Sequence, residues 1–215
     1  MKKEYIRHLE VYGVEYYYSS FSSMLSLEKW GNRESAEAYL EKYWLQEEEY
    51  LRIWKPIQNK IFQDVRFPDM VFRQGFNLIA LRGSCLFVEE DFLMLQKSLL
   101  QLGEEHFVVI QHSDEFTDGE PMFRMKFPVN ITWAELNSGN YISAVLIGMV
   151  YNTYYIFGIK GNWGKYVDND DFPPLDIIGF KMETAAVFKK YHKRPKEEED
   201  EINGWVPEIY RNLIL

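Results

Sequence analysis

Residues 158–174 read GIKGNWGKYVDNDDFPP, with three glycines spaced three apart and three aspartates ahead of two prolines. The Gly161-Asn162 pair suits a tight turn between strands, because both residue types tolerate the backbone angles that such turns need. The sequence therefore predicts a β-hairpin, in which one strand runs to Lys160 and WGKYVD forms the returning strand. The Asp/Asn run that follows is predicted to be an exposed polar loop, a place where binding residues often lie.

The same stretch does not match the common ligand-binding motifs. Its glycines do not form G-x-G-x-x-G, and the Gly164-Lys165 pair is followed by Tyr166 instead of the Ser or Thr of a phosphate-binding loop. A calcium-binding loop that began at Asp168 would have Gly179 in the position where an acid is required. We therefore predict no structural metal and no cofactor.

The residues before this stretch, YISAVLIGMVYNTYYIFGI at 141–159, include no charged side chain and are nearly long enough to cross a bilayer. Asn152 and Thr153 interrupt the run, and its Val, Ile, Tyr and Phe residues favour strands. We predict two adjacent antiparallel strands at the centre of a sheet, joined by a turn near Tyr151–Thr153, and no membrane association.

Helical patterns dominate the first part of the chain and recur later. Residues 33–54 have apolar side chains at spacings of three, four and seven, which predicts one amphipathic helix that Pro56 ends or kinks. Residues 89–103 predict a second helix closed by Gly103, and Thr132 with Glu135 has the spacing of a capping box. Strands are predicted for HFVVIQH, MFRMKFP and LDIIGF.

This order of elements predicts an α+β fold, with an N-terminal helical part followed by a largely antiparallel β-sheet with inserted helices. We expect a single α+β domain over residues 1–192, of which 1–64 are mostly helical and 65–192 are sheet-rich. Five basic and five acidic residues lie between Lys189 and Glu201, so residues 193–215 are predicted to be a charged linker and a C-terminal extension.

Composition narrows the function classes. The 215 residues have a net charge of −9, which argues against nucleic-acid binding and suits a basic protein partner. A single cysteine, Cys85, rules out an internal disulfide framework, and no apolar segment follows the N-terminal MKKEYIRHLE, so we expect a cytoplasmic protein. Thirty-six aromatic residues (15 Phe, 15 Tyr and 6 Trp) indicate an aromatic core.

The candidate catalytic groups are few. His112 with Asp114 and Glu115 is the best cluster for metal binding or acid–base chemistry, but a surface or hydrogen-bonded histidine explains it as well. Cys85 precedes an apolar run, which favours a buried strand thiol over a nucleophile.

Three segments of the second half, FRQGFNLIALRGSCLFVEEDF, GNWGKYVDND and PLDIIGF, resemble small cytosolic bacterial proteins of uncharacterised or toxin-immunity type. The resemblance covers roughly residues 70–190 and includes no catalytic motif. It implies a protein without enzymatic activity that binds and blocks a partner.

We therefore expect a non-catalytic binding protein, an immunity-type inhibitor of a basic partner, whose oligomeric state the sequence leaves open. An acidic partner can occupy the basic cleft of a nuclease, and nearby aromatic residues can serve as anchors. The alternatives are an enzyme that uses the acidic and histidine cluster, and a structural or regulatory interaction module. The expected binding residues are Trp163, Tyr166, Asp168, Asp170 and Asp171.

Overall fold

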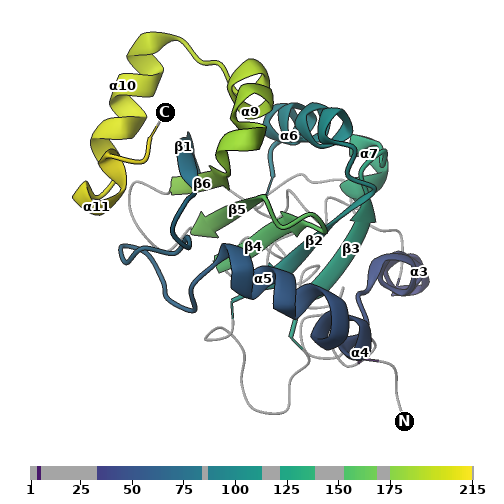
Figure 1. Cartoon of the computed structure of the whole chain (residues 1–215). Helices are drawn as coiled ribbons and strands as arrows, with labels where there is room; N and C mark the ends of the chain where they lie inside the picture. Colours follow the sequence, from purple (N-terminus) through teal and green to yellow (C-terminus); the bar gives the residue numbers. More distant parts are fainter. Residues whose placement is uncertain are drawn as a thin grey trace.

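The computed structural model describes residues 4–5, 33–83, 87–112, 122–138, 153–168 and 175–214 (Figure 1). Its strands are β1 (Asn77–Arg82), β2 (His106–Gln111), β3 (Arg124–Pro128), β4 (Thr153–Gly158), β5 (Trp163–Asp168) and β6 (Leu175–Phe180). They form one sheet in the order β1-β6-β5-β4-β2-β3, and every neighbouring pair is antiparallel. Helices precede the sheet and are inserted between its strands, so the predicted α+β class is confirmed.

The predicted hairpin is present. Strands β4 and β5 pair directly, and Gly161 in the turn has a φ of 67°, a conformation that glycine adopts without strain. Of the two adjacent strands predicted within 141–160, the structure describes the second as β4. Strand β4 pairs with β2 along one edge and with β5 along the other, and the first predicted strand stays a prediction. Residues 139–152 lie outside the described part.

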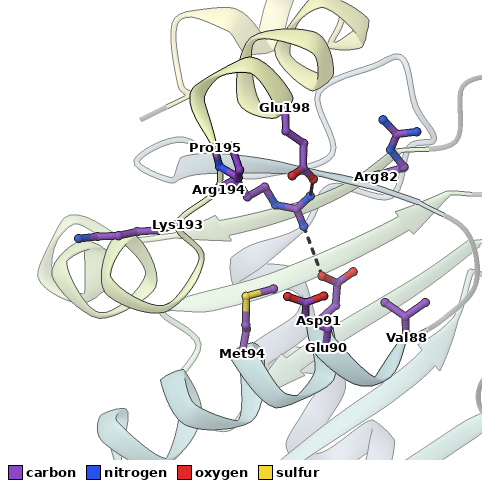
Figure 2. Close-up of a pocket in the computed structure, with 9 residues that line it drawn as sticks. All are labelled: Arg82, Val88, Glu90, Asp91, Met94, Lys193, Arg194, Pro195 and Glu198. Carbon is purple, nitrogen blue, oxygen red and sulfur yellow. Dashed lines mark hydrogen bonds and ion pairs between the residues drawn. The ribbon is translucent and has the colours of Figure 1, made fainter.

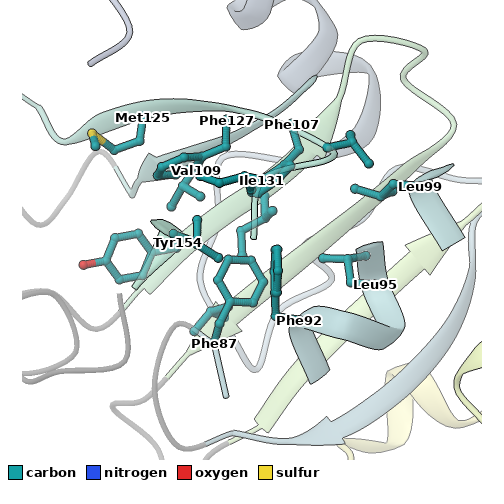
Figure 3. Close-up of a cluster of buried hydrophobic side chains, with 14 of the residues drawn as sticks. Phe87, Phe92, Leu95, Leu99, Phe107, Val109, Met125, Phe127, Ile131 and Tyr154 are labelled. Atoms are coloured by element: carbon teal, nitrogen blue, oxygen red, sulfur yellow. The ribbon is translucent and has the colours of Figure 1, made fainter. Parts of the chain in front are cut away.

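Each face of the sheet has its own hydrophobic core, because successive side chains of a strand point to opposite faces. One face is covered by α3 (Arg33–Tyr43), α6 (Glu89–Leu102), α7 (Trp133–Leu136) and α9 (Ala185–Tyr191). Aromatic rings of Phe87, Phe92 and Phe107 meet there, as Figure 3 shows. The second face is covered by α5 (Lys55–Ile61) with the segment after it, and by α10 (Lys196–Trp205) and α11 (Glu208–Arg211).

The long helix predicted over 33–54 is divided in two. Helix α3 ends at Tyr43, because Trp44 forms an antiparallel bridge with Met125 at the outer edge of β3. The chain then continues through α4 (Glu47–Glu49), a π-helical turn η1 (Tyr50–Trp54) and α5. Pro56 does not end this helix. It lies in the first turn of α5, where a missing backbone donor is tolerated.

Two helix-end predictions are confirmed. Gly103 follows α6 in the left-handed conformation, with a φ of 66°. The hydroxyl of Thr132 accepts a hydrogen bond from the backbone N–H of Glu135, as expected for an N-cap of α7. The carboxylate of Glu135 does not complete a capping box and instead binds the side chains of Lys42 and Tyr43.

Aromatic rings lie directly on the second face of the sheet at two glycines. These are Gly164 on β5 and Gly179 on β6, which are cross-strand partners. A Cβ atom at Gly164 would be 2.5 Å from the ring of Phe62, and one at Gly179 would overlap the ring of Phe72. Phe62 and Phe72 contact each other with ring centroids 5.2 Å apart. Gly164 and Gly179 therefore serve the packing of these two rings.

The C-terminal charged run is helical. The sequence predicted a linker for this run, but Lys196–Trp205 is α10, and the helix contacts β1. The backbone N–H of Leu78 on β1 donates to the carbonyl of Leu213 at 2.8 Å, and Leu78 and Ile214 form a parallel bridge. Figure 1 shows the C-terminal segment returning to β1. The division of the chain at residue 192 stays a prediction.

Candidate functional site

A cleft opens where the first turn of α6, the end of β1 and the connection from α9 to α10 meet (Figure 2). Its volume is about 270 Å³. The cleft is lined by three cationic, three acidic and three uncharged side chains: Arg82, Lys193, Arg194, Glu90, Asp91, Glu198, Val88, Met94 and Pro195. We call it the α6–α10 cleft.

Local sequence places these charges. Helix α6 begins after Val88 with Glu89, Glu90 and Asp91 in its first turn, where acidic side chains interact favourably with the helix dipole. Pro195 stands at the N-cap of α10 with φ −55° and ψ 143°, so the chain turns there and Arg194 projects from just before the helix. The cleft therefore lies between two helix N-termini, both rich in carboxylates.

Arg194 joins the two helices across the cleft. One of its terminal nitrogens is 2.6 Å from Oε1 of Glu198 on α10, and the other is 3.3 Å from Oδ1 of Asp91 on α6 (Figure 2). The side chains of Arg194 and Asp91 are 13% and 14% exposed, so water screens this pair only partly. The bridge holds α10 against α6 and gives the cleft a defined shape.

A second ion pair lies below the cleft, within the sheet. Nζ of Lys165 on β5 is 2.6 Å from Oδ2 of Asp176 on β6, and both side chains are 2% exposed. The Lys165 ammonium also lies 5.0 Å from the ring centroid of Phe87. Burial raises the pKa of Asp176 to about 6, although the attraction of Lys165 lowers it, and Asp91 raises it further.

His192 completes the buried charged region. Its ring stacks on Phe188 with a centroid distance of 5.9 Å, and neither ring nitrogen makes a hydrogen bond to a described residue. Burial lowers the pKa of His192 to about 4, and the positive charges of Lys165 and Arg194 add to this effect. The imidazole is therefore neutral at pH 7.

The two helices that flank the cleft carry exposed acids, of which Glu90 lines the cleft itself. Five carboxylates on α6 and α10 are exposed and take part in no ion pair in the described parts of the chain: Glu89, Glu90, Glu197, Glu199 and Asp200. A sixth, Glu201, is 3.3 Å from Arg82, with both side chains about half exposed. We call these six side chains on α6 and α10 the acidic rim. They present negative charge to solvent, while the side chains that line the cleft carry three positive and three negative charges.

The expected binding residues on β5 are buried and lie on opposite faces. Trp163 faces α9 and donates a hydrogen bond to Glu104 at 3.0 Å. Tyr166 faces the second core and donates to Asp168 at 3.0 Å. The structure therefore brings Tyr166 and Asp168 together and separates them from Trp163. Asp170 and Asp171 lie outside the described residues, and binding by these five residues stays a prediction.

His112 is buried beside Tyr155, with ring centroids 5.3 Å apart. Asp114, Glu115 and Cys85 lie outside the described residues, so the expected cluster is not described as a whole. Within the parts that are described, no group of three or more His, Cys, Asp or Glu side chains is arranged to hold a metal ion. No described helix is long and apolar enough to span a membrane.

Sequence reasoning missed the Lys165–Asp176 pair and the Arg194 bridge. The Lys165–Asp176 pair had a signal in the sequence. Each of the two charged residues lies two positions from an apolar residue of its predicted strand, and residues two apart in a strand share one face of the sheet. In the Arg194 bridge, only the pair with Glu198 has a sequence signal, the i,i+4 spacing. The contact with Asp91 has none, because Asp91 and Arg194 are far apart in sequence. Comparisons of the chain with protein-family models, curated proteins and solved structures found no match.

Proposed function

We propose that the protein is a non-catalytic binding protein that recognises a basic protein partner, in the manner of an immunity protein, through the acidic rim of the α6–α10 cleft. The observation that carries the proposal is the set of five exposed carboxylates on α6 and α10, two helices that Arg194 holds together. None of the five has an ion-pair partner among the described residues.

Electrostatics supports this choice of surface. A net charge of −9 attracts a basic partner over long distances, and unpaired rim carboxylates raise the association rate. Asp91 and Glu198 inside the cleft are already paired with Arg194, and a partner does not have to break this bridge to approach the exposed acids. Apolar contact area is available in the cleft itself, since Val88 lines it and is 38% exposed.

The proposed surface differs from the expected loop. Trp163, Tyr166 and Asp168 are almost fully buried, so a partner would reach them only if the sheet opened. The acids of α6 and α10 need no such rearrangement, and we therefore assign the recognition to them.

The test begins with capture of partners from the native host by the tagged protein. Association kinetics of the identified partner are then measured at several salt concentrations. The variant E197Q/E199Q/D200N should lower the association rate about 10-fold at low salt and should reduce the salt dependence, because rim charges act mainly on encounter.

A matched control removes three other exposed acids, Glu47, Glu48 and Glu183, by the same change to glutamine. It alters the net charge equally and should reduce the rate much less. Equal effects of the two triple variants, or a partner whose association ignores salt and both variants, would refute the α6–α10 surface as the recognition site.

A further inference from the structure

A second cleft, separate from the α6–α10 cleft, lies at the β4–β5 turn. It has a volume of about 790 Å³, in the range of small-molecule sites. Four cationic side chains, three side-chain amides and one glycine line it: Lys60, Arg73, Lys160, Lys181, Asn59, Gln63, Gln74 and Gly161. We call it the basic cleft, and it shares no residue with the α6–α10 cleft.

The charge of the basic cleft opposes that of the whole chain. Its lining includes four cations and no acid, although the protein has a net charge of −9. Among the residues that the structure describes, none of these four cations is within ion-pair distance of a carboxylate. Four like charges around one concavity repel one another, and a bound anion would remove that repulsion.

Part of the donor capacity is already used. Nε of Arg73 donates to the carbonyls of Asn59 and Phe62 at the end of α5, at 3.2 and 3.1 Å. Nζ of Lys160 binds the carbonyl of Leu102, at the end of α6. These bonds hold the Arg73 and Lys160 side chains in place at the cleft.

The remaining donors are available to a ligand. The terminal guanidinium nitrogens of Arg73, the ammonium groups of Lys60 and Lys181, and the amide of Gln74 have no hydrogen-bond partner among the described residues. The Lys181 ammonium lies 5.7 Å from the ring centroid of Phe76, a contact that leaves its N–H donors without an oxygen acceptor in the described residues. One carboxylate contacts the β4–β5 turn in the described residues: Glu104 accepts a hydrogen bond from the backbone N–H of Lys160 at 3.4 Å. Its side chain is only 4% exposed and does not line the cleft.

We propose that the basic cleft binds a phosphate-bearing small molecule with a chain of two or three phosphates. Guanidinium and ammonium groups are the usual protein donors to phosphate oxygens, and several converging cations match several phosphates. A small ligand fits better than a nucleic acid, because the acidic remainder of the molecule repels a long polyanion.

The test uses tripolyphosphate as the probe and isothermal titration calorimetry at low ionic strength. Wild-type protein should bind one equivalent, and K60Q/K181Q should bind at least about 10-fold more weakly, since a charge-assisted hydrogen bond contributes about a factor of ten or more. ATP and inorganic sulfate are titrated in parallel. Tripolyphosphate and ATP binding with equal affinity would assign recognition to the phosphates alone. Tighter binding of ATP would support phosphate binding in the basic cleft and would indicate further contacts with the nucleoside. Sulfate, which has a single anionic group, should bind much more weakly.

The matched control is K97Q/K189Q, which removes two exposed lysines of α6 and α9 with the same change of charge. It should keep wild-type affinity. The proposal is refuted if neither probe binds saturably, or if both double variants weaken binding equally, because the net charge and not the cleft would then determine binding. Circular dichroism of both variants checks that each is folded.

Discussion

At the residue scale, His192 is a buried histidine that its surroundings keep uncharged. Its pKa falls from 6.5 to about 4, so the folded protein binds fewer protons there than the unfolded chain between these values. Stability from this group is therefore present above pH 6.5 and is lost as the pH falls towards 4. Asp176 has the opposite effect on stability. Its pKa rises from 3.8 to about 6, so its contribution to stability is present at low pH and is lost as the pH rises through 6.

The variant His192→Phe should isolate the histidine contribution. Phenylalanine keeps the stacking on Phe188 and removes a titrating group whose two nitrogens have no described partner. The free energy of unfolding of H192F should rise relative to wild type by up to about 3 kcal/mol as the pH falls from 7 to 4. Urea unfolding at a series of pH values measures this difference. His106→Phe is the control and should leave the His192 contribution in place, and parallel pH profiles of wild type and H192F would disprove the assignment.

At the element scale, the close packing of rings on strands β5 and β6 depends on glycine. Gly179→Ala should lower the free energy of unfolding by about 1–3 kcal/mol, because its Cβ would overlap the buried ring of Phe72. Gly204→Ala in α10 is the matched control, since a Cβ there meets no atom within 4 Å. It should be neutral or stabilising by up to about 1 kcal/mol, as for other glycines in helices. Equal midpoints of the two variants in urea would contradict the role of Gly179.

At the scale of the whole molecule, short bridges cover both edges of the sheet. Trp44 pairs with Met125 on β3, and Ile214 pairs with Leu78 on β1. Exposed sheet edges promote association between chains, so these bridges protect the fold as well as stabilise it. The C-terminal segment also buries Ile202, Val206 and Tyr210 against the second core.

A chain that ends at Pro195 should therefore be much less stable and should aggregate, as measured by thermal unfolding and light scattering. Tyr210→Phe tests the same contact in a folded protein. The Tyr210 hydroxyl accepts from the N–H of Val71 at 3.0 Å and donates to the carbonyl of Asp69, so its removal should cost about 1–3 kcal/mol. Tyr191→Phe on α9 should be nearly neutral. Wild-type stability of both the shortened chain and Y210F would rule out this role of the C-terminus.

Local patterns predicted the local structure. The hairpin at Gly161, the cap at Thr132, the end of α6 at Gly103 and the α+β class all depend on neighbouring residues, and all are confirmed. The net charge and the lack of matching ligand motifs are likewise properties of the sequence alone, and they define the class of partner that we propose.

Tertiary contacts decided the rest. Periodicity favoured one helix through Trp44, but pairing with Met125 on a strand some eighty residues away outweighs a helical preference of a few tenths of a kcal/mol per residue. Successive side chains of β5 point to opposite faces of the sheet, so Trp163 and Tyr166 lie in different cores. Only the fold placed Arg194 between Asp91 and Glu198. Both clefts consist of side chains from distant segments, and no pattern within one segment records which segments will meet.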